Sequence, residues 1–203
     1  MLVHGSGSGP WIFDGWAAWF PGVRVSAVDL HAGRDAEATS MAGYAAVVAA
    51  AGRTLPRPMA VCGWSMGGLV ALCAAARVRP AHVVLLEPSP PAEVQGFHPE
   101  IRLRPGSFDP EEAYGPFPKG MRARPASSLA RDERKRGLSV PSLPCPSLVV
   151  YGKDFPDERG ARIAGLYGSD QLAFDDLDHW GLVLDQRVPE ALARSLGVAG
   201  GAG

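Results

Sequence analysis

Short apolar runs alternate along the chain with segments whose apolar residues recur at helical spacing. The runs have the length of β-strands and lie at 1–3, 23–30, 59–63, 82–86 and 147–151, with a weaker run at 172–177. Helices are expected between them, at 13–20, 41–51, 67–77, 158–167 and 188–196. Strands that alternate with helices predict an α/β fold, in which a mainly parallel sheet has helices on both faces.

This alternation stops between residues 93 and 144, where the chain is rich in Pro, Arg and Glu. Apolar periodicity is absent there, apart from one expected helix at 126–136. We interpret 93–144 as a cap or lid inserted into one core, which residues 1–92 and 145–196 form. The Gly- and Ala-rich tail at 197–203 is expected to be disordered.

Composition indicates an ordinary globular protein of 203 residues, with 46% apolar residues and a net charge of -1. This balance gives no sign of nucleic-acid or membrane partners. Three cysteines, an odd number, argue against a disulfide framework. The chain has neither an apolar run of ~20 residues nor a secretory signal pattern, so we expect a cytoplasmic protein.

The segment Gly63-Trp64-Ser65-Met66-Gly67-Gly68 matches the pattern Gly-x-Ser-x-Gly between an expected strand and an expected helix. Such a turn is sharp and holds the serine at its apex, while the flanking glycines leave room where a Cβ would collide. We therefore interpret Ser65 as a nucleophile. The alternative is an ordinary Gly-rich turn.

A serine needs a base, and of the five histidines His179 is the best placed. It lies on a loop between the last expected strand and the last helix. Where a Gly-x-Ser-x-Gly turn carries the nucleophile, the three catalytic residues follow the chain order Ser, acid, His, and His179 fits the last place. His82 opens a strand at the opposite end of the sheet, and His98 lies in the cap segment. The alternative for His179 is a plain loop histidine.

The acid that orients the histidine should follow a strand at the same edge of the sheet. Asp154 follows the strand at 147–151 closely, so we assign it first. Asp157 is three residues further along, and Glu87, at the end of the preceding strand, is a credible substitute. Each of these three acids could instead be a solvated loop residue.

Two backbone N–H groups are expected to form an oxyanion hole. The Met66 N–H lies at the start of the helix after Ser65, and the Ser6 N–H, or else that of Gly7, lies in the loop His4-Gly5-Ser6-Gly7-Ser8-Gly9-Pro10. The side chain of His4 is expected to hold this loop by hydrogen bonds. No Gly-Lys-Ser/Thr follows the loop, so it is not a P-loop.

Aromatic residues flank these segments, and core packing explains most of them. Trp64 and Trp180 are the better candidates for a substrate pocket, because each neighbours an expected catalytic residue. His4, Gly5 and Trp11 complete the expected lining. An aromatic pocket favours a small-molecule substrate with an apolar or aryl acyl group.

With these motifs placed, the chain resembles the α/β-hydrolase superfamily, in particular its small esterase-like members. The matching pieces, in chain order, are His4-Gly5 with its loop and Trp16, Asp29-Leu30, the turn at 63–68, the segment 151–154 and Asp178-His179. The resemblance implies a Ser-His-acid hydrolase of carboxylic esters or thioesters, without metal or other cofactor, in which a cap shapes specificity.

In the family this His-Gly loop follows the third strand of an eight-stranded sheet, and here only residues 1–3 precede it. The strand at 23–30 would then be an exposed edge, and an unpaired edge can pair with a second copy. A homodimer is one hypothesis, and a natural start further upstream is the other.

Three other functions remain open at this point. The resemblance also covers lyases and cofactor-free peroxidases that use the same triad, as well as binding proteins that kept the fold without catalysis. A thioesterase acting on an acidic acyl-carrier protein would use the cap arginines Arg122, Arg124, Arg131, Arg134 and Arg136, although these could equally form a solvated face.

Overall fold

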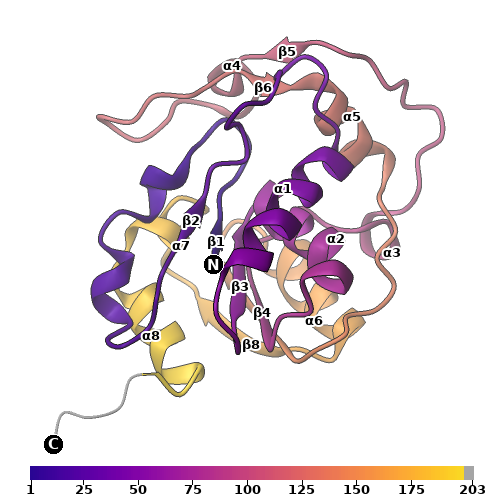
Figure 1. The fold of residues 1–203 in the computed structure, drawn as a ribbon. Helices are drawn as coiled ribbons and strands as arrows, with labels where there is room; N and C mark the ends of the chain where they lie inside the picture. The colour runs from indigo at the N-terminus through magenta and orange to yellow at the C-terminus, as the bar shows by residue number, and fades with distance from the viewer. Residues whose placement is uncertain (199–203) are drawn as a thin grey trace, which may run out of the picture.

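The computed structural model describes residues 1–198, and its centre is a parallel sheet with the strand order β2-β1-β3-β4-β7-β8 (Figure 1). Its strands are β1 (Leu2–Val3), β2 (Ala27–Val28), β3 (Ala60–Trp64), β4 (His82–Leu86), β7 (Ser147–Gly152) and β8 (Asp170–Phe174). Each neighbouring pair is parallel, which confirms the expected α/β sheet.

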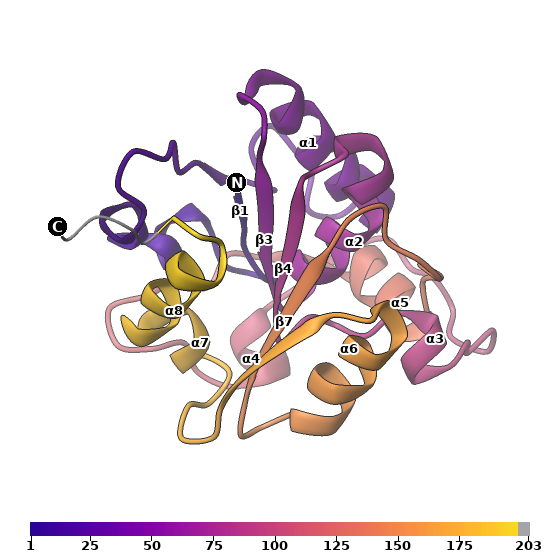
Figure 2. The ribbon, with the colours of Figure 1, turned by 90° about the horizontal axis from the view of Figure 1, so that it is seen from below.

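Helices cover both faces of this sheet (Figure 2). One layer contains α1 (Met41–Thr54), α2 (Met66–Val78), α3 (Ala92–Gln95) and α6 (Arg162–Tyr167). The other contains the 3-10 helices η1 (Pro10–Phe13) and η2 (Trp16–Trp19), followed late in the chain by α7 (Gly181–Leu184) and α8 (Arg187–Ser195). The sheet is therefore the middle layer of three.

The middle residues of the central strands are apolar because each face of the sheet is covered. In β4, Val83 and Leu85 pack into the layer of α1 and α2, while Val84 and Leu86 pack into the layer of α7 and α8. All four side chains have 0% exposure. This alternation follows from the two-residue period of a strand, and it divides the core into two apolar clusters.

Residues 93–144 contain β5 (Ser107–Phe108), α4 (Pro110–Tyr114), β6 (Ala126–Ser127) and α5 (Ser128–Arg136), and they lie across the carboxyl end of the sheet (Figure 1). Hydrogen bonds join this cap to the core. The Ser127 hydroxyl donates to the Thr39 carbonyl at 2.6 Å, and Glu133 accepts from the Met41 N–H at 2.6 Å. The Ser127 side chain also caps α5, which therefore begins two residues later than the sequence predicted.

Several expected elements differ in extent. The helix expected at 13–20 is instead two 3-10 helices, separated at Gly15 with its φ of 83°. The strand expected at 23–30 pairs only at Ala27–Val28, because β1 offers only Leu2–Val3 as its partner. A π-helical turn, Pro156–Ala161, precedes α6.

β2 is the edge strand, as expected, but at two residues it offers few unpaired backbone groups. The tail predicted to be disordered falls mostly on residues 199–203, which lie outside the described residues. Within residues 1–198, the helices are too short or too polar to cross a membrane.

Candidate active site

Ser65 occupies the turn between β3 and α2, with φ 55° and ψ −122°. A non-glycine residue rarely adopts a positive φ, and such strain persists where the surrounding structure fixes it. Here the Ser65 N–H donates to the Leu86 carbonyl at 3.0 Å, and its carbonyl accepts from the N–H of Ser89 at 2.9 Å. A Cβ on Gly63 would collide with the Gly67 carbonyl, so the tight turn requires glycine.

The imidazole of His179 contacts Glu87, with 2.6 Å between Nδ1 and Oε2. Asp154, our first choice of acid, does not hold this nitrogen. Its Oδ2 accepts instead from the backbone N–H of His179 at 2.9 Å, so Asp154 fixes the loop rather than the ring. Asp157 lies in the π-helical turn after Asp154.

Glu87 is fully buried at the end of β4, with a φ of 41°. Its second oxygen, Oε1, accepts from the Gly152 N–H at 2.9 Å, and its own N–H donates to the Val150 carbonyl at 2.8 Å. A buried carboxylate is tolerated only when it is paired and hydrogen-bonded, and both oxygens of Glu87 meet that condition. This carboxylate is therefore held rigidly against the histidine.

Trp64 holds the histidine from a second side. Its ring stacks on that of His179, with centroids 4.8 Å apart, and its Nε1–H donates to the His179 carbonyl at 3.1 Å. Because Glu87 contacts Nδ1, the other nitrogen, Nε2, is free to face the cavity that His179 and Ser65 both line. Within residues 1–198 the serine hydroxyl makes no direct hydrogen bond to the ring, and such bonds often tighten only with substrate.

The expected oxyanion donors lie next to this pair. Met66 is the first residue of α2, and Ser6 lines the same cavity as Ser65. Within the part of the chain that the structure describes, neither backbone N–H donates to a protein acceptor. A Cβ on Gly5 would lie 2.8 Å from the Trp64 ring and 3.2 Å from the Ser65 Cβ, so the loop carrying Ser6 passes close to the serine.

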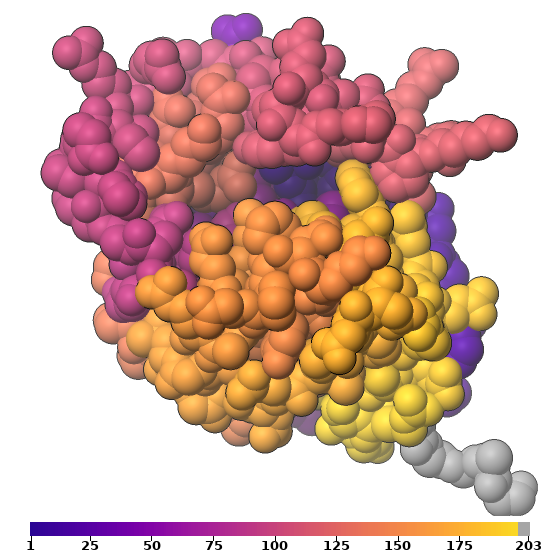
Figure 3. All heavy atoms as spheres, turned by 180° about the vertical axis from the view of Figure 1, so that it is seen from behind, coloured from indigo at the N-terminus to yellow at the C-terminus, as the bar shows by residue number. Residues whose placement is uncertain are grey.

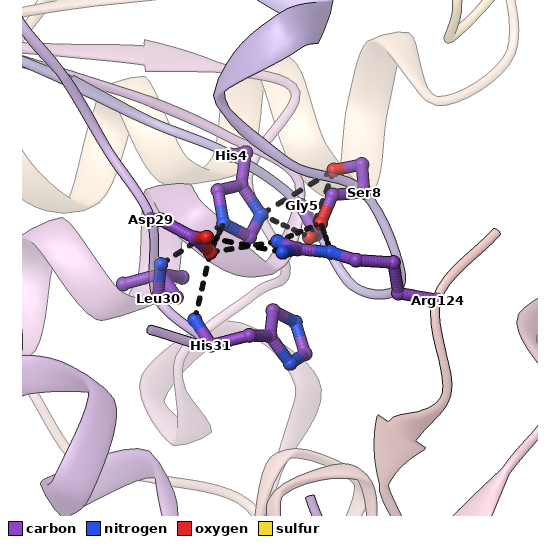
Figure 4. Close-up of polar contacts among 7 residues, drawn as sticks. All are labelled: His4, Gly5, Ser8, Asp29, Leu30, His31 and Arg124. Atoms are coloured by element: carbon purple, nitrogen blue, oxygen red, sulfur yellow. Dashed lines mark hydrogen bonds and ion pairs between the residues drawn. The ribbon is translucent and has the colours of Figure 1, made fainter. Parts of the chain in front are cut away.

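His4 is buried beneath this loop (Figure 4). Burial lowers the pKa of His4 to about 4, so its ring is neutral at pH 7. One ring nitrogen, Nδ1, donates to the Gly5 carbonyl at 2.9 Å, and Nε2 accepts from the Leu30 N–H at 3.0 Å. The expectation that His4 holds the loop by hydrogen bonds agrees with these contacts.

Arg124 joins the cap to the same loop (Figure 4). Its guanidinium donates to both carboxylate oxygens of Asp29, at 2.7 and 3.0 Å, and to the Ser8 carbonyl at 2.8 Å. The hydrogen bonds from Arg124 hold the pKa of Asp29 well below its usual range. The cap therefore takes part in fixing the loop that carries Ser6.

Ser65 and His179 open on a cavity of about 340 Å³. Figure 3 shows a hollow between the cap, in magenta and pink, and the later part of the core, in orange and yellow. The volume suits a small molecule. Its lining is aromatic and charged, with Trp64, Tyr114, Phe117, Phe155, Trp180, Arg134, Arg159, Asp154 and Asp178 beside the two expected catalytic residues.

Trp64 and Trp180 line the cavity as expected, whereas His4, Gly5 and Trp11 lie outside its lining. The cavity is also lined by Phe117, Phe155 and Arg159, which the sequence did not single out, and by Arg134, which was expected only on the outer face of the cap. Phe117 lies in a part of the cap without periodicity, and Arg134 lies in the expected cap helix, whose last residues are all charged and so do not indicate which side chains turn inward. Phe155 could have been proposed from the sequence, because it directly follows the candidate acid Asp154.

The cap arginines are mostly engaged within the chain. Arg124 pairs with Asp29, Arg131 lies over the Phe108 ring at 4.2 Å, and Arg136 lies over the Phe97 ring at 5.7 Å. Arg134 turns into the cavity. An acidic carrier protein would therefore meet fewer free guanidinium groups than the sequence suggested.

Comparison with known proteins places the chain in a family. Residues 1–195 match the model of the alpha/beta hydrolase family, and the chain belongs to it. It is 30% identical, over 137 residues, to a pimeloyl-[acyl-carrier protein] methyl ester esterase of Aromatoleum aromaticum. That match covers 65% of this chain and 48% of the relative, so the chain spans about half the length of this curated relative.

Solved structures share the fold at low identity. Polyneuridine aldehyde esterase superposes with a TM-score of 0.68 at 18% identity, over 97% of each chain. The Arabidopsis methylesterase MES16 gives 0.68 at 19%, again over 97% of each chain. The type II thioesterase BorB, from the borrelidin biosynthetic cluster, gives 0.65 at 19%, over 97% of this chain and 89% of that one.

Proposed function

We propose that this protein hydrolyses a carboxylic ester or thioester of a small molecule through an acyl-enzyme on Ser65. The observation that carries the proposal is the 2.6 Å contact between the buried Glu87 carboxylate and His179 Nδ1, in a cavity that Ser65 also lines. A histidine oriented in this way beside a serine on a strained turn is the arrangement that activates a hydroxyl.

In the proposed reaction the Ser65 oxygen attacks the carbonyl carbon while His179 Nε2 takes its proton. Glu87 fixes the ring and stabilises its protonated form. The Ser6 and Met66 N–H groups bind the developing oxyanion. His179 then returns the proton to the leaving alcohol or thiol. A water molecule, deprotonated by the same histidine, releases the acid and restores the serine.

The names of the relatives fit this class of reaction. A methyl ester esterase, two further esterases and a thioesterase all cleave an acyl bond by name, and together they favour ester or thioester hydrolysis over lyase chemistry. The aromatic lining favours an acyl or leaving group with apolar surface.

The test uses 4-nitrophenyl butyrate with the wild type and Ser65→Ala. We expect a burst of nitrophenol equal to the enzyme concentration if deacylation is slow, and labelling of Ser65 by a fluorophosphonate probe. Ser65→Ala should lose both. Undiminished turnover in Ser65→Ala would reject the nucleophile, and a wild type that neither turns over nor takes the probe would favour a non-catalytic binding protein.

A further inference from the structure

Two arginines from different segments of the chain line the candidate active site. Arg134 lies on α5 of the cap, and Arg159 lies in the π-helical turn that follows β7. Both line the cavity that contains Ser65 and His179. A partly buried guanidinium charge is costly unless it is paired or hydrogen-bonded.

Neither guanidinium has a carboxylate partner within 4.0 Å among residues 1–198. Arg134 donates only to neutral hydroxyls, those of Ser89 and Tyr114, each at 3.2 Å. Arg159 lies over the Phe155 ring at 4.0 Å, and in the described chain its guanidinium donates no hydrogen bond. The Nε atoms of both arginines are buried and unpartnered.

The acids that share the cavity lining do not pair with these arginines. Asp154 accepts from the His179 N–H at 2.9 Å, and Asp178 accepts from the Gly181 N–H at 2.7 Å. Burial lowers the pKa of Arg159 and the positive charge of Arg134 acts in the same direction, whereas the negative charges of Glu87 and Glu158 raise it. The two like charges are therefore close enough to act on each other.

Each of the two arginines is linked to a candidate catalytic residue through one intervening side chain or residue. Ser89, which accepts from Arg134, donates its N–H to the Ser65 carbonyl at 2.9 Å. Phe155, under Arg159, lies edge-on to the His179 ring with centroids 6.0 Å apart. An anion held by both arginines would thus lie within one small cavity with the reacting carbonyl.

We propose that Arg134 and Arg159 form an anion subsite, and that the substrate is an ester carrying a carboxylate at the far end of its acyl chain. The proposal rests on the proposed ester hydrolysis and adds the class of substrate. Planar guanidinium groups bind a carboxylate through paired hydrogen bonds, and an apolar chain between the two ends would contact the aromatic lining.

The kinetic test compares two esters of equal chain length, 4-nitrophenyl hydrogen adipate and 4-nitrophenyl hexanoate. We expect the wild type to prefer the adipate by roughly 10- to 100-fold in kcat/KM, the range of one or two charge-assisted hydrogen bonds. In Arg159→Gln and Arg134→Gln this preference should fall at least tenfold. Arg122→Gln, an exposed arginine of the same cap, is the matched control and should keep it.

A second measurement does not depend on hydrolysis. We would measure adipate binding to Ser65→Ala by calorimetry. Binding should be lost when Arg159→Gln is added and partly kept with Arg159→Lys, because the lysine ammonium keeps the positive charge but lacks the planar guanidinium. Absence of turnover together with adipate binding would reject the hydrolase and keep the subsite. Equal kcat/KM for the two esters, or a preference unchanged in both glutamine variants, would overturn the subsite.

Discussion

At the scale of single residues, the position of Glu87 follows from strand register. Trp64, the last residue of β3, pairs with Leu86, the last residue of β4. The next residues, Ser65 and Glu87, therefore leave neighbouring strands at the same level, and both adopt a positive φ. Asp154 leaves β7 two residues after Gly152 and reaches only the backbone of His179.

The two acids are distinguished by matched amide substitutions. We expect Glu87→Gln to lower kcat by about 10³- to 10⁴-fold, because the amide no longer stabilises the protonated ring and permits the wrong tautomer. Asp154→Asn, which keeps an oxygen for the His179 N–H, should lose less than about tenfold. Steady-state rates on 4-nitrophenyl butyrate give both values, and the reverse order would return the role to Asp154.

A second residue-scale prediction concerns pH and His4. Its pKa in the folded protein is about 4, against an ordinary value of 6.5, so between these values the unfolded chain binds a proton that the folded chain does not. The free energy of unfolding should therefore fall as the pH drops from 6.5 to 4, by up to about 3 kcal/mol. Above pH 6.5 this contribution is fully present.

Urea denaturation between pH 4 and 7.5 measures this effect, and His4→Gln is the comparison. The variant should be less stable at pH 7 but show a shallower decline toward pH 4. Burial also lowers the pKa of His31, which stacks on His4 at 5.6 Å, so part of the decline should remain. Parallel stability curves for the wild type and the variant would contradict the assignment to His4.

At the scale of elements, apolar runs predicted the central strands because these are buried on both faces. Prediction was poor where pairing or local turns decide the structure. Residues 23–26 have strand composition but lack a partner strand, since β1 is two residues long. Likewise, the short helix α7 follows the loop of His179 and has too few residues to show a period.

The candidate site, like the fold, was predictable only in part. Ser65 and His179 could be proposed from motif and chain order, because each lies on a loop that follows the carboxyl end of a strand, where the reactive groups of a parallel sheet gather. The choice between Glu87 and Asp154 needed the strand register. The role of Arg124 needed the path of the cap, which carries no periodic pattern to place it.

The link between the cap and the Ser6 loop gives an element-scale prediction. Arg124→Gln removes the side-chain contacts to Asp29 and Ser8, which leaves the loop held by His4 and by the hydrogen bond from the backbone N–H of residue 124 to the Gly7 carbonyl. We expect kcat to fall roughly 10- to 100-fold, less than for loss of an oxyanion donor, with KM nearly unchanged. The exposed Arg122→Gln should behave as wild type, and an unchanged kcat in Arg124→Gln would show that the cap does not position the loop.

At the scale of the whole molecule, the reactivity of the buried thiol of Cys62 can measure how firmly the layers are packed together. Cys62 lies in β3 and packs in the cluster that includes Leu182 and Val188 of the C-terminal helices. Burial raises the pKa of Cys62 to about 12 and that of Cys73 to about 11. Because the thiolate is the reactive form, both should react slowly while their surroundings stay closed.

This protection tests whether the segment that brings His179 to the site can detach from the sheet. In a chain with Cys73→Ala and Cys145→Ala, the reaction of Cys62 with Ellman's reagent should require global unfolding and accelerate with urea as the unfolding equilibrium does. If α7 and α8 open on their own, Cys62 will react at a rate almost independent of urea. In that case His179 would be placed by a mobile segment, and the Glu87–His179 contact would be one of several states rather than a fixed part of the fold.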